Sequence, residues 1–116
     1  MPKPFRGEIW WADVPLGRGS EPSDWRPVLI IQNDQANQSE RYHNTIALVI
    51  STSGTPVSFH IPLTPTAENG LSARSVIKCE QVMTISDERL DRCIGQISSE
   101  EMHLVNRAIK RVLDLE

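Results

Sequence analysis

Two side chains beside apolar segments have the chemistry to act on a phosphate group. Arg26 stands where a polar loop, residues 15–25, meets the apolar run PVLIIQ of residues 27–32. A guanidinium there can hold a phosphate through two parallel hydrogen bonds. Thr52 follows the apolar run TIALVI of residues 45–50, and its hydroxyl can donate to a phosphate oxygen. Taken alone, the residues favour plainer roles: an ion pair that tethers the loop for Arg26, and an ordinary turn for Thr52.

Three tryptophans are candidates for stacking on the bases of single-stranded RNA. Trp25 precedes Arg26 at the end of the loop, and it is the best placed of the three to stack. Aromatic side chains are more often core or interface residues. We therefore expect Trp11 in the core and Trp10 against a loop or a partner. His60 lies in an alternating segment and is expected to face solvent.

The elements that must position these side chains are short β-strands. Apolar residues that alternate or run continuously predict strands, the last of them with a bulge, at residues 7–14, 27–32, 45–50, 57–63 and 75–85. The runs at 27–32 and 45–50 are continuous, which predicts central strands that are buried on both faces. Polar loops separate the strands, at residues 15–25, 33–44 and 64–73.

A helix is predicted at the end of the chain. Ser98 and Glu101 have the spacing of a capping box. Apolar residues then recur on one helical face: Met102, Val105, Ile109, Val112 and Leu113. Ser86 is expected to cap one helical turn before this helix. Several short strands with a terminal helix predict a mainly β fold, a small, strongly bent sheet or barrel with the helix over one side.

Composition and charge narrow the class of protein. The 116 residues fit one domain, and the formal net charge of −3 lacks the basic excess typical of nucleic-acid binding. A site for RNA would therefore be a local basic patch, drawn from Arg18, Arg26, Arg74 and Lys78. We find no signal peptide and no apolar run of about 18 residues that could span a membrane, so we expect a cytoplasmic protein.

The cysteines and histidines give no sign of a metal site. Cys79 and Cys93 lie far apart without a C-x-x-C motif, so we expect two reduced, buried thiols. His43, His60 and His103 have no zinc-ligand spacing with either cysteine. We therefore expect neither a metal nor another cofactor.

Four segments together resemble the MazF/PemK-type toxins. The pattern R-G-[ED]-[IV]-[WY], then G-S-E, then R-P-[VA]-[VL] is met by residues 6–10, 19–21 and 26–29. A Thr/Ser segment after a buried strand matches residues 51–53, and V-x-x-x-[ED]-Q-x-x-T-I matches residues 76–85. The segments keep the order and spacing of the family and cover nearly the whole chain. The resemblance therefore implies one MazF/PemK-like domain over residues 1–116.

The resemblance also implies a fold, an activity and partners. The fold would be the CcdB/Kid-like barrel of plasmid maintenance toxins, in a homodimer. The activity would be that of an endoribonuclease toxin of a type II toxin–antitoxin system, which cleaves messenger RNA at specific single-stranded sequences without a metal. Attack by the 2′-hydroxyl would leave a 2′,3′-cyclic phosphate and a 5′-hydroxyl, and the cuts would inhibit translation and growth. A labile antitoxin would neutralise the protein.

Site residues follow from the matched positions. The catalytic set would be Arg26, Thr52 and Glu80, with Ser51 an alternative to Thr52 as the hydroxyl. Glu80 would act as the general base, or it would only orient Arg26 or pair with Lys78. Lys78 stands where some members carry Arg and is expected to bind phosphate as a cation. The substrate-binding residues would be Ser20, Glu21, Trp25, Ser51, Ser53, Lys78 and Gln81.

Two other functions are compatible with such a fold. The chain could be a toxin that binds a protein target such as DNA gyrase, or an RNA-binding relative without activity. A gyrase poison has no need of Arg26, Thr52 and Glu80, which favours the nuclease. The nuclease hypothesis requires those three side chains to converge around one phosphodiester.

Overall fold

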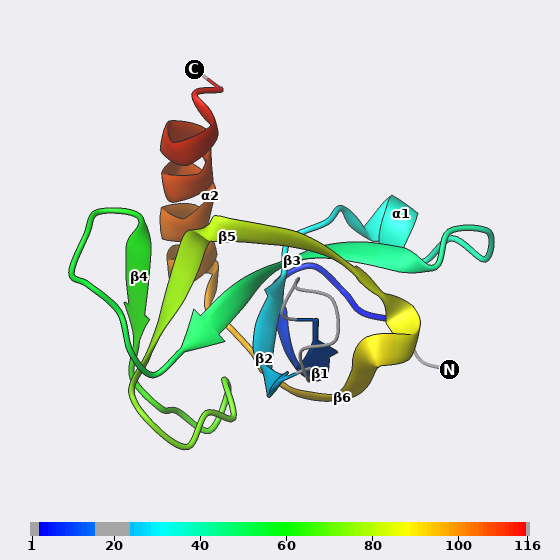
Figure 1. Cartoon of the computed structure of the whole chain (residues 1–116), viewed down its shortest axis with the longest axis horizontal. Coiled ribbons are helices and arrows are strands. Elements are labelled where there is room, and N and C mark those ends of the chain that lie inside the picture. Colours follow the sequence, from blue (N-terminus) through cyan, green and yellow to red (C-terminus); the bar gives the residue numbers. More distant parts are fainter. Residues whose placement is uncertain (1–2, 16–23, 116) are drawn as a thin grey trace.

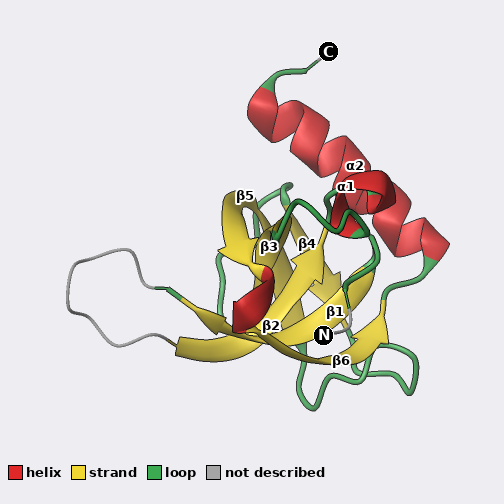
Figure 2. Ribbon diagram, turned by 90° about the vertical axis from the view of Figure 1, so that its right-hand side faces the viewer, coloured by secondary structure: helices red, strands yellow, loops and turns green. Residues whose placement is uncertain are grey.

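The computed structural model describes residues 3–15 and 24–115, and within them one antiparallel sheet dominates the fold. The sheet has the strand order β4-β5-β3-β2-β1-β6, with α2 packed on one side of it (Figures 1 and 2). The elements in chain order are β1 (Glu8–Val14), β2 (Asp24–Ile30), α1 (Asp34–Asn37), β3 (Asn44–Ser51), β4 (His60–Leu63), β5 (Ser75–Ser86), the 3-10 turn η1 (Asp87–Arg89), β6 (Leu90–Gln96) and α2 (Ser99–Leu113). This confirms the mainly β fold with a C-terminal helix.

Both faces of the central strands are buried, as their continuous apolar runs predict. In β2, Leu29 packs with Val105 and Ala108 of α2, while its neighbours Val28 and Ile30 pack in a second cluster on the opposite face. The second cluster is enclosed because the sheet curls around it (Figure 2). Two cores on one sheet fix β2 and β3 firmly; Arg26 lies in β2, and Thr52 directly follows β3.

A large bulge bends β5. Opposite two consecutive residues of β3, the pairing jumps from Val82 to Lys78, so residues 79–81 stand outside the ladder. Cys79 turns into the core and is fully buried, whereas Glu80 and Gln81 are exposed. The predicted bulge is confirmed, and bulges of this kind re-aim side chains.

The terminal helix α2 has the predicted capping box. The Ser98 hydroxyl accepts from the Glu101 amide at 3.1 Å, and the Glu101 carboxylate accepts from the Ser98 amide at 2.9 Å. The predicted apolar face packs on the sheet through Met102, Val105 and Ile109, but Leu113 is 49% exposed. Its predicted burial is wrong because the last turns of the helix extend beyond the sheet (Figure 1). None of the described helices has the length and apolar character needed to cross a membrane.

Several local predictions are corrected by the structure. Strand β6 was not predicted, because its sequence LDRCIGQ has few buried residues.

Trp10, expected against a loop or partner, is buried in the second core, and its indole nitrogen donates to Glu8 at 3.0 Å. Trp11, expected in the core, is only half-buried. Shifts in the β1–β6 register, between residues 9 and 10 and between 11 and 12, break the simple alternation along β1. Cys93, expected to be buried, is exposed, and both described cysteines are free thiols.

Candidate active site

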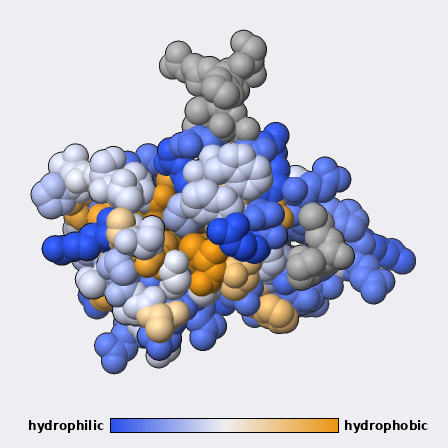
Figure 3. Space-filling view, turned by 90° about the horizontal axis from the view of Figure 1, so that it is seen from below, coloured by the Kyte–Doolittle hydropathy of each residue, from blue (hydrophilic) through white to orange (hydrophobic). Residues whose placement is uncertain are grey.

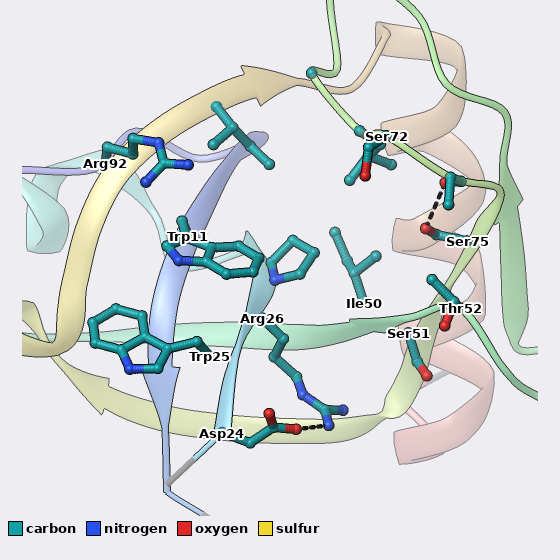
Figure 4. A pocket seen from close by; sticks show the side chains of 15 residues that line it. Trp11, Asp24, Trp25, Arg26, Ile50, Ser51, Thr52, Ser72, Ser75 and Arg92 are labelled. Carbon is teal, nitrogen blue, oxygen red and sulfur yellow. Dashed lines mark hydrogen bonds and ion pairs between the residues drawn. The ribbon is translucent and has the colours of Figure 1, made fainter.

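A pocket of about 530 Å³ lies where β1, β2 and the end of β3 face the loop before β5 (Figure 4). Figure 3 shows the underside of the molecule, where hydrophobic side chains near the middle are bordered by strongly hydrophilic ones. The pocket is lined by Trp11, Asp24, Trp25, Arg26, Pro27, Ile50, Ser51, Thr52, Gly70, Leu71, Ser72, Ala73, Ser75, Arg92 and Ile94. It has an aromatic end, a charged middle and a hydroxyl-rich end.

Arg26 occupies the charged middle of the pocket. Strand β2 begins at Asp24, three residues before the predicted strand, so Asp24 and Arg26 project from the same face of the strand. Their side chains form an ion pair and are 42% and 32% exposed. The Nε atom of Arg26 is buried and has no hydrogen-bond partner among the described residues. Asp24 holds the guanidinium through Nη2, and the Nη1 hydrogens have no acceptor among the described residues, so they can donate to a ligand.

The hydroxyl-rich end distinguishes Thr52 from Ser51. The Ser51 hydroxyl accepts from the Ser53 amide at 3.2 Å and lies 3.4 Å from the Ser53 hydroxyl. Thr52 lines the same pocket, is exposed, and its hydroxyl has no hydrogen bond to any described residue. The Thr52 hydroxyl is therefore the freer of the two to donate to a ligand. Ser53 does not belong to the pocket lining.

The aromatic end joins three side chains from different strands. The guanidinium carbon of Arg92, on β6, lies 5.9 Å from the ring centroid of Trp11, at the range of a cation–π contact. Trp25 is 49% exposed beside them, as expected of a stacking residue. Arg92 is missing from the sequence candidates because β6 was not predicted. Asp24 was missed because it was assigned to the loop. Residues two apart share a face in a strand, but not in a loop.

Glu80 lies outside this pocket and is held by His60. The Nε2 atom of His60 lies 2.9 and 3.0 Å from the two Glu80 oxygens, and Nδ1 lies 2.8 Å from the Thr55 carbonyl. The His60 side chain is only 8% exposed, so the prediction that it faces solvent is wrong. The prediction that Glu80 orients Arg26 is also wrong, because Asp24 makes that ion pair.

Electrostatics at Glu80 reflect these neighbours. Desolvation raises the pKa of its carboxyl, but the hydrogen bond and charge of His60 and the charge of Lys78 lower the pKa to a value below the ordinary 4.5. Glu80 is therefore an anion at neutral pH. Lys78 and Gln81 also lie outside the pocket lining. Ser20 and Glu21, and the cation Arg18, fall outside the described residues.

The pocket is more basic than the chain as a whole. Its described lining contains two arginines, Arg26 and Arg92, against one carboxylate, Asp24, whereas the chain carries a net charge of −3. Arg74 does not belong to the lining. Over residues 3–15 and 24–115, no group of three or more His, Cys, Asp or Glu side chains is placed to hold a metal ion. The groups present can bind a phosphate and exchange a proton.

Comparisons with known proteins place the chain in a family. The sequence profile of the family described as "PemK-like, MazF-like toxin of type II toxin-antitoxin system" matches residues 5–113. Endoribonuclease MazF6 of Mycobacterium tuberculosis is 37% identical over 114 residues, which is 95% of this chain and 96% of that protein.

Solved structures show the same fold. The Mycobacterium tuberculosis toxin MazF-mt6 matches with a TM-score of 0.77 at 26% identity, over 94% of this chain and 98% of that chain. An endoribonuclease from a mycobacterial species, solved in complex with its cognate antitoxin, matches with a TM-score of 0.77 at 21% identity, over 97% of each chain. The bent sheet with its terminal helix is thus an arrangement that other proteins share.

Proposed function

This chain belongs to the PemK-like, MazF-like toxins of type II toxin–antitoxin systems and is an endoribonuclease; we propose that it cleaves single-stranded messenger RNA with the substrate's own 2′-hydroxyl as nucleophile. The observation that carries this proposal is the presence of the Arg26 guanidinium and the free Thr52 hydroxyl in one pocket. Attack by the 2′-hydroxyl on the adjacent phosphorus leaves a 2′,3′-cyclic phosphate and a 5′-hydroxyl. The cuts stop translation and growth.

Arg26 and Thr52 stabilise the charge that develops on the phosphate. A guanidinium can bind two phosphate oxygens at once, and its value is greatest where charge builds up during the reaction. The Thr52 hydroxyl donates to a further oxygen of the phosphorane. Arg26 lies in β2 and Thr52 directly follows β3, and two cores hold these strands in place, so the donors are oriented before the substrate binds.

Asp24 is the described carboxylate that can take the nucleophile's proton. It lines the pocket beside Arg26, and Glu80 does not. The 2′-hydroxyl proton passes to Asp24, and the departing 5′-oxygen takes a proton from water at the exposed, hydroxyl-rich end. The nucleophile is already part of the RNA, so this route requires no metal ion.

The substrate and partners follow from the shape of the pocket and from the family. Trp25 and Trp11 stack the bases that flank the scissile phosphate, which requires unpaired RNA. A domain spanning residues 1–116 works as a homodimer in the cytoplasm, and a cognate antitoxin binds and blocks it. The mycobacterial endoribonuclease was likewise solved in complex with its cognate antitoxin. The antitoxin competes with RNA for the same basic pocket.

The direct experiment maps RNA ends. Purified protein is incubated with a mixed RNA in EDTA, and the termini are identified. We expect cuts at a defined sequence with cyclic phosphate ends, and no cuts with Arg26→Ala. Intact RNA together with stalled DNA gyrase would instead support a toxin that binds a protein target.

A further inference from the structure

The segment between β3 and β4 is fastened through the His60 ring. Both ring nitrogens are engaged, one with the Thr55 carbonyl at 2.8 Å and the other with Glu80 on the β5 bulge at 2.9 Å. Thr55 lies three residues beyond Thr52, the hydroxyl proposed for catalysis. The ring therefore joins the segment that carries this hydroxyl to the bulged strand.

Both partners of the ring are hydrogen-bond acceptors. A backbone carbonyl and an ionised carboxylate can only accept hydrogen bonds. Both contacts are therefore hydrogen bonds at the same time only when each ring nitrogen of His60 carries a hydrogen. The hydrogen bonds of a charged, nearly buried imidazolium are stronger than those of a neutral ring, because both are short and the bond to the carboxylate is charge-assisted.

Gly54 packs closely against β5 and the His60 ring. A methyl group added at Gly54 would lie 2.9 Å from a Val76 methyl, 3.4 Å from Nδ1 of His60 and 3.5 Å from Cε of Lys78. The segment thus rests directly on β5 between the catalytic hydroxyl and the ring. Phe59 supports the ring from the side, edge to face, at 5.3 Å between ring centroids.

We propose that His60 and Glu80 form an ionic clamp that sets the position of the Thr52 hydroxyl in the pocket. This proposal rests on the nuclease function proposed above, and it makes both side chains positioning residues. It also gives Glu80 a role other than that of general base, since its oxygens are committed to His60. The clamp adds to the tethers that the segment carrying Thr52 has at Ser51, at Ser58 and at β4.

Other charged and titratable groups surround the clamp. Lys78 lies on the same strand as Glu80 and helps to lower the pKa of its carboxyl. Arg111, on α2, donates to the Ser58 carbonyl at 3.3 Å and so fastens the segment from the other side. Burial raises the pKa of the Cys79 thiol to about 11, so this neighbour stays neutral. The clamp therefore opens when Glu80 gains a proton.

Nitrogen-15 NMR tests the protonation state without RNA. In the full-length protein at pH 7, we expect hydrogens on both ring nitrogens of His60. The exposed ring of His103 serves as the internal control. A neutral His60 ring at pH 7 would overturn the clamp, whatever the protein does to RNA.

Cleavage kinetics test the effect on catalysis. Glu80→Gln keeps the shape of the side chain and removes its charge, and we expect kcat to fall roughly 10- to 100-fold, as expected of a misplaced catalytic group, with KM within about twofold. Glu80→Asp should recover part of the rate. Glu88→Gln removes an exposed carboxylate next to β5 and should cleave at the wild-type rate.

The outcomes separate this proposal from the nuclease function. If the wild-type protein cleaves RNA and Glu80→Gln cleaves equally well, the clamp does not position Thr52 and the function stands. If the wild-type protein does not cleave, the function fails, and the proposed role of the clamp fails with it. Two-dimensional NMR spectra confirm that each variant is folded. His60→Gln removes the other partner of the pair and provides a second test of the clamp in the same cleavage assay.

Discussion

At the scale of single residues, hydrogen bonds favour one of two adjacent hydroxyls for the proposed catalytic role. Ser51 and Thr52 adjoin in sequence and both line the pocket, but the Ser51 hydroxyl is engaged with Ser53. Thr52→Val should lower kcat about 100-fold, in the range seen when one donor to a developing oxyanion is removed. Thr52→Ser keeps the hydroxyl and should retain most activity.

Ser51→Ala is the matched control for this prediction. This substitution removes a hydroxyl next to Thr52. It should change kcat less than about threefold, because no transition-state donor is removed. Single-turnover cleavage of a defined RNA measures all three rates. A larger loss in Ser51→Ala than in Thr52→Val would reverse the assignment.

The Glu80 carboxylate should couple the stability of the fold to pH. Its pKa is lower in the folded chain than the ordinary value of 4.5, so its stabilising effect is complete above pH 4.5 and is lost as pH falls through the folded value. The side chain is 35% exposed and solvent screens the pair, so the effect is small, about 0.5–1 kcal/mol.

Urea denaturation of the wild-type protein and Glu80→Gln tests this coupling. At pH 7 the variant should be the less stable of the two, and the difference should shrink toward zero by pH 3. Glu88→Gln should show no such trend. A difference that stays constant from pH 7 to pH 3 would contradict an ionic contribution.

At the scale of elements, the wall of the pocket depends on a close approach of two glycines. Gly70 has φ of +68°, and a methyl group there would lie 1.9 Å from the Ile94 carbonyl oxygen. Gly95 makes the reciprocal approach, with an added methyl 2.3 Å from the Glu68 carbonyl oxygen. The loop before β5 is thereby pressed against β6, and it brings Ser72 and Ala73 into the pocket.

Gly70→Ala should therefore destabilise the fold by roughly 1–3 kcal/mol, from backbone strain and overlap. It should also weaken RNA binding, because the loop has to move away from β6. Ala67→Ser, at an exposed position in the same loop, should stay within about 0.5 kcal/mol of wild type. Chemical denaturation measures both variants, and an unchanged midpoint for Gly70→Ala would show that the loop is not held by this contact.

The elements also show where prediction from sequence succeeds. Continuous apolar runs located β2 and β3, and the capping pattern at Ser98 located α2, because burial and local hydrogen bonds leave a direct trace in the sequence. The missed strand β6 is stabilised by pairing with β1 rather than by its own apolar residues. The register shifts between β1 and β6 likewise leave no local signal in the sequence, so Trp11 was expected in the core in place of Trp10.

The candidate site was only partly predictable for a related reason. Family patterns placed Arg26 and Thr52, which the fold brings into one pocket. They also suggested Glu80, which the bulge of β5 directs to His60 instead. Asp24 and Arg92 take their places in the pocket from strand boundaries and registers, and no local pattern in the sequence specifies either of these.

At the scale of the whole molecule, charge distribution determines how RNA is bound. The chain is acidic overall, with a net charge of −3, and Arg26 and Arg92 supply the cations of the described pocket. Contacts with about two phosphates predict a slope near −1.4 for the logarithm of the binding constant against the logarithm of salt concentration. Binding should therefore be weak and moderately sensitive to salt.

Fluorescence anisotropy with a non-cleavable RNA analogue measures this slope. Arg92→Ala should reduce its magnitude by about 0.7, the share of one phosphate contact on a single strand. Lys110→Ala, on the exposed face of α2, should leave the slope unchanged. A slope near zero for the wild-type protein would contradict binding through the pocket cations.

The central claim is that Arg26 and Thr52 stabilise attack by the 2′-hydroxyl of RNA on its own phosphate. The most direct measurement compares an RNA that carries the mapped cleavage sequence with the same RNA lacking only the 2′-hydroxyl at the cut, both in EDTA. We predict a 2′,3′-cyclic phosphate from the first, no cleavage of the second by the wild-type protein, and no cleavage of either by Arg26→Ala. Cleavage of the 2′-deoxy substrate at the same position would contradict the account.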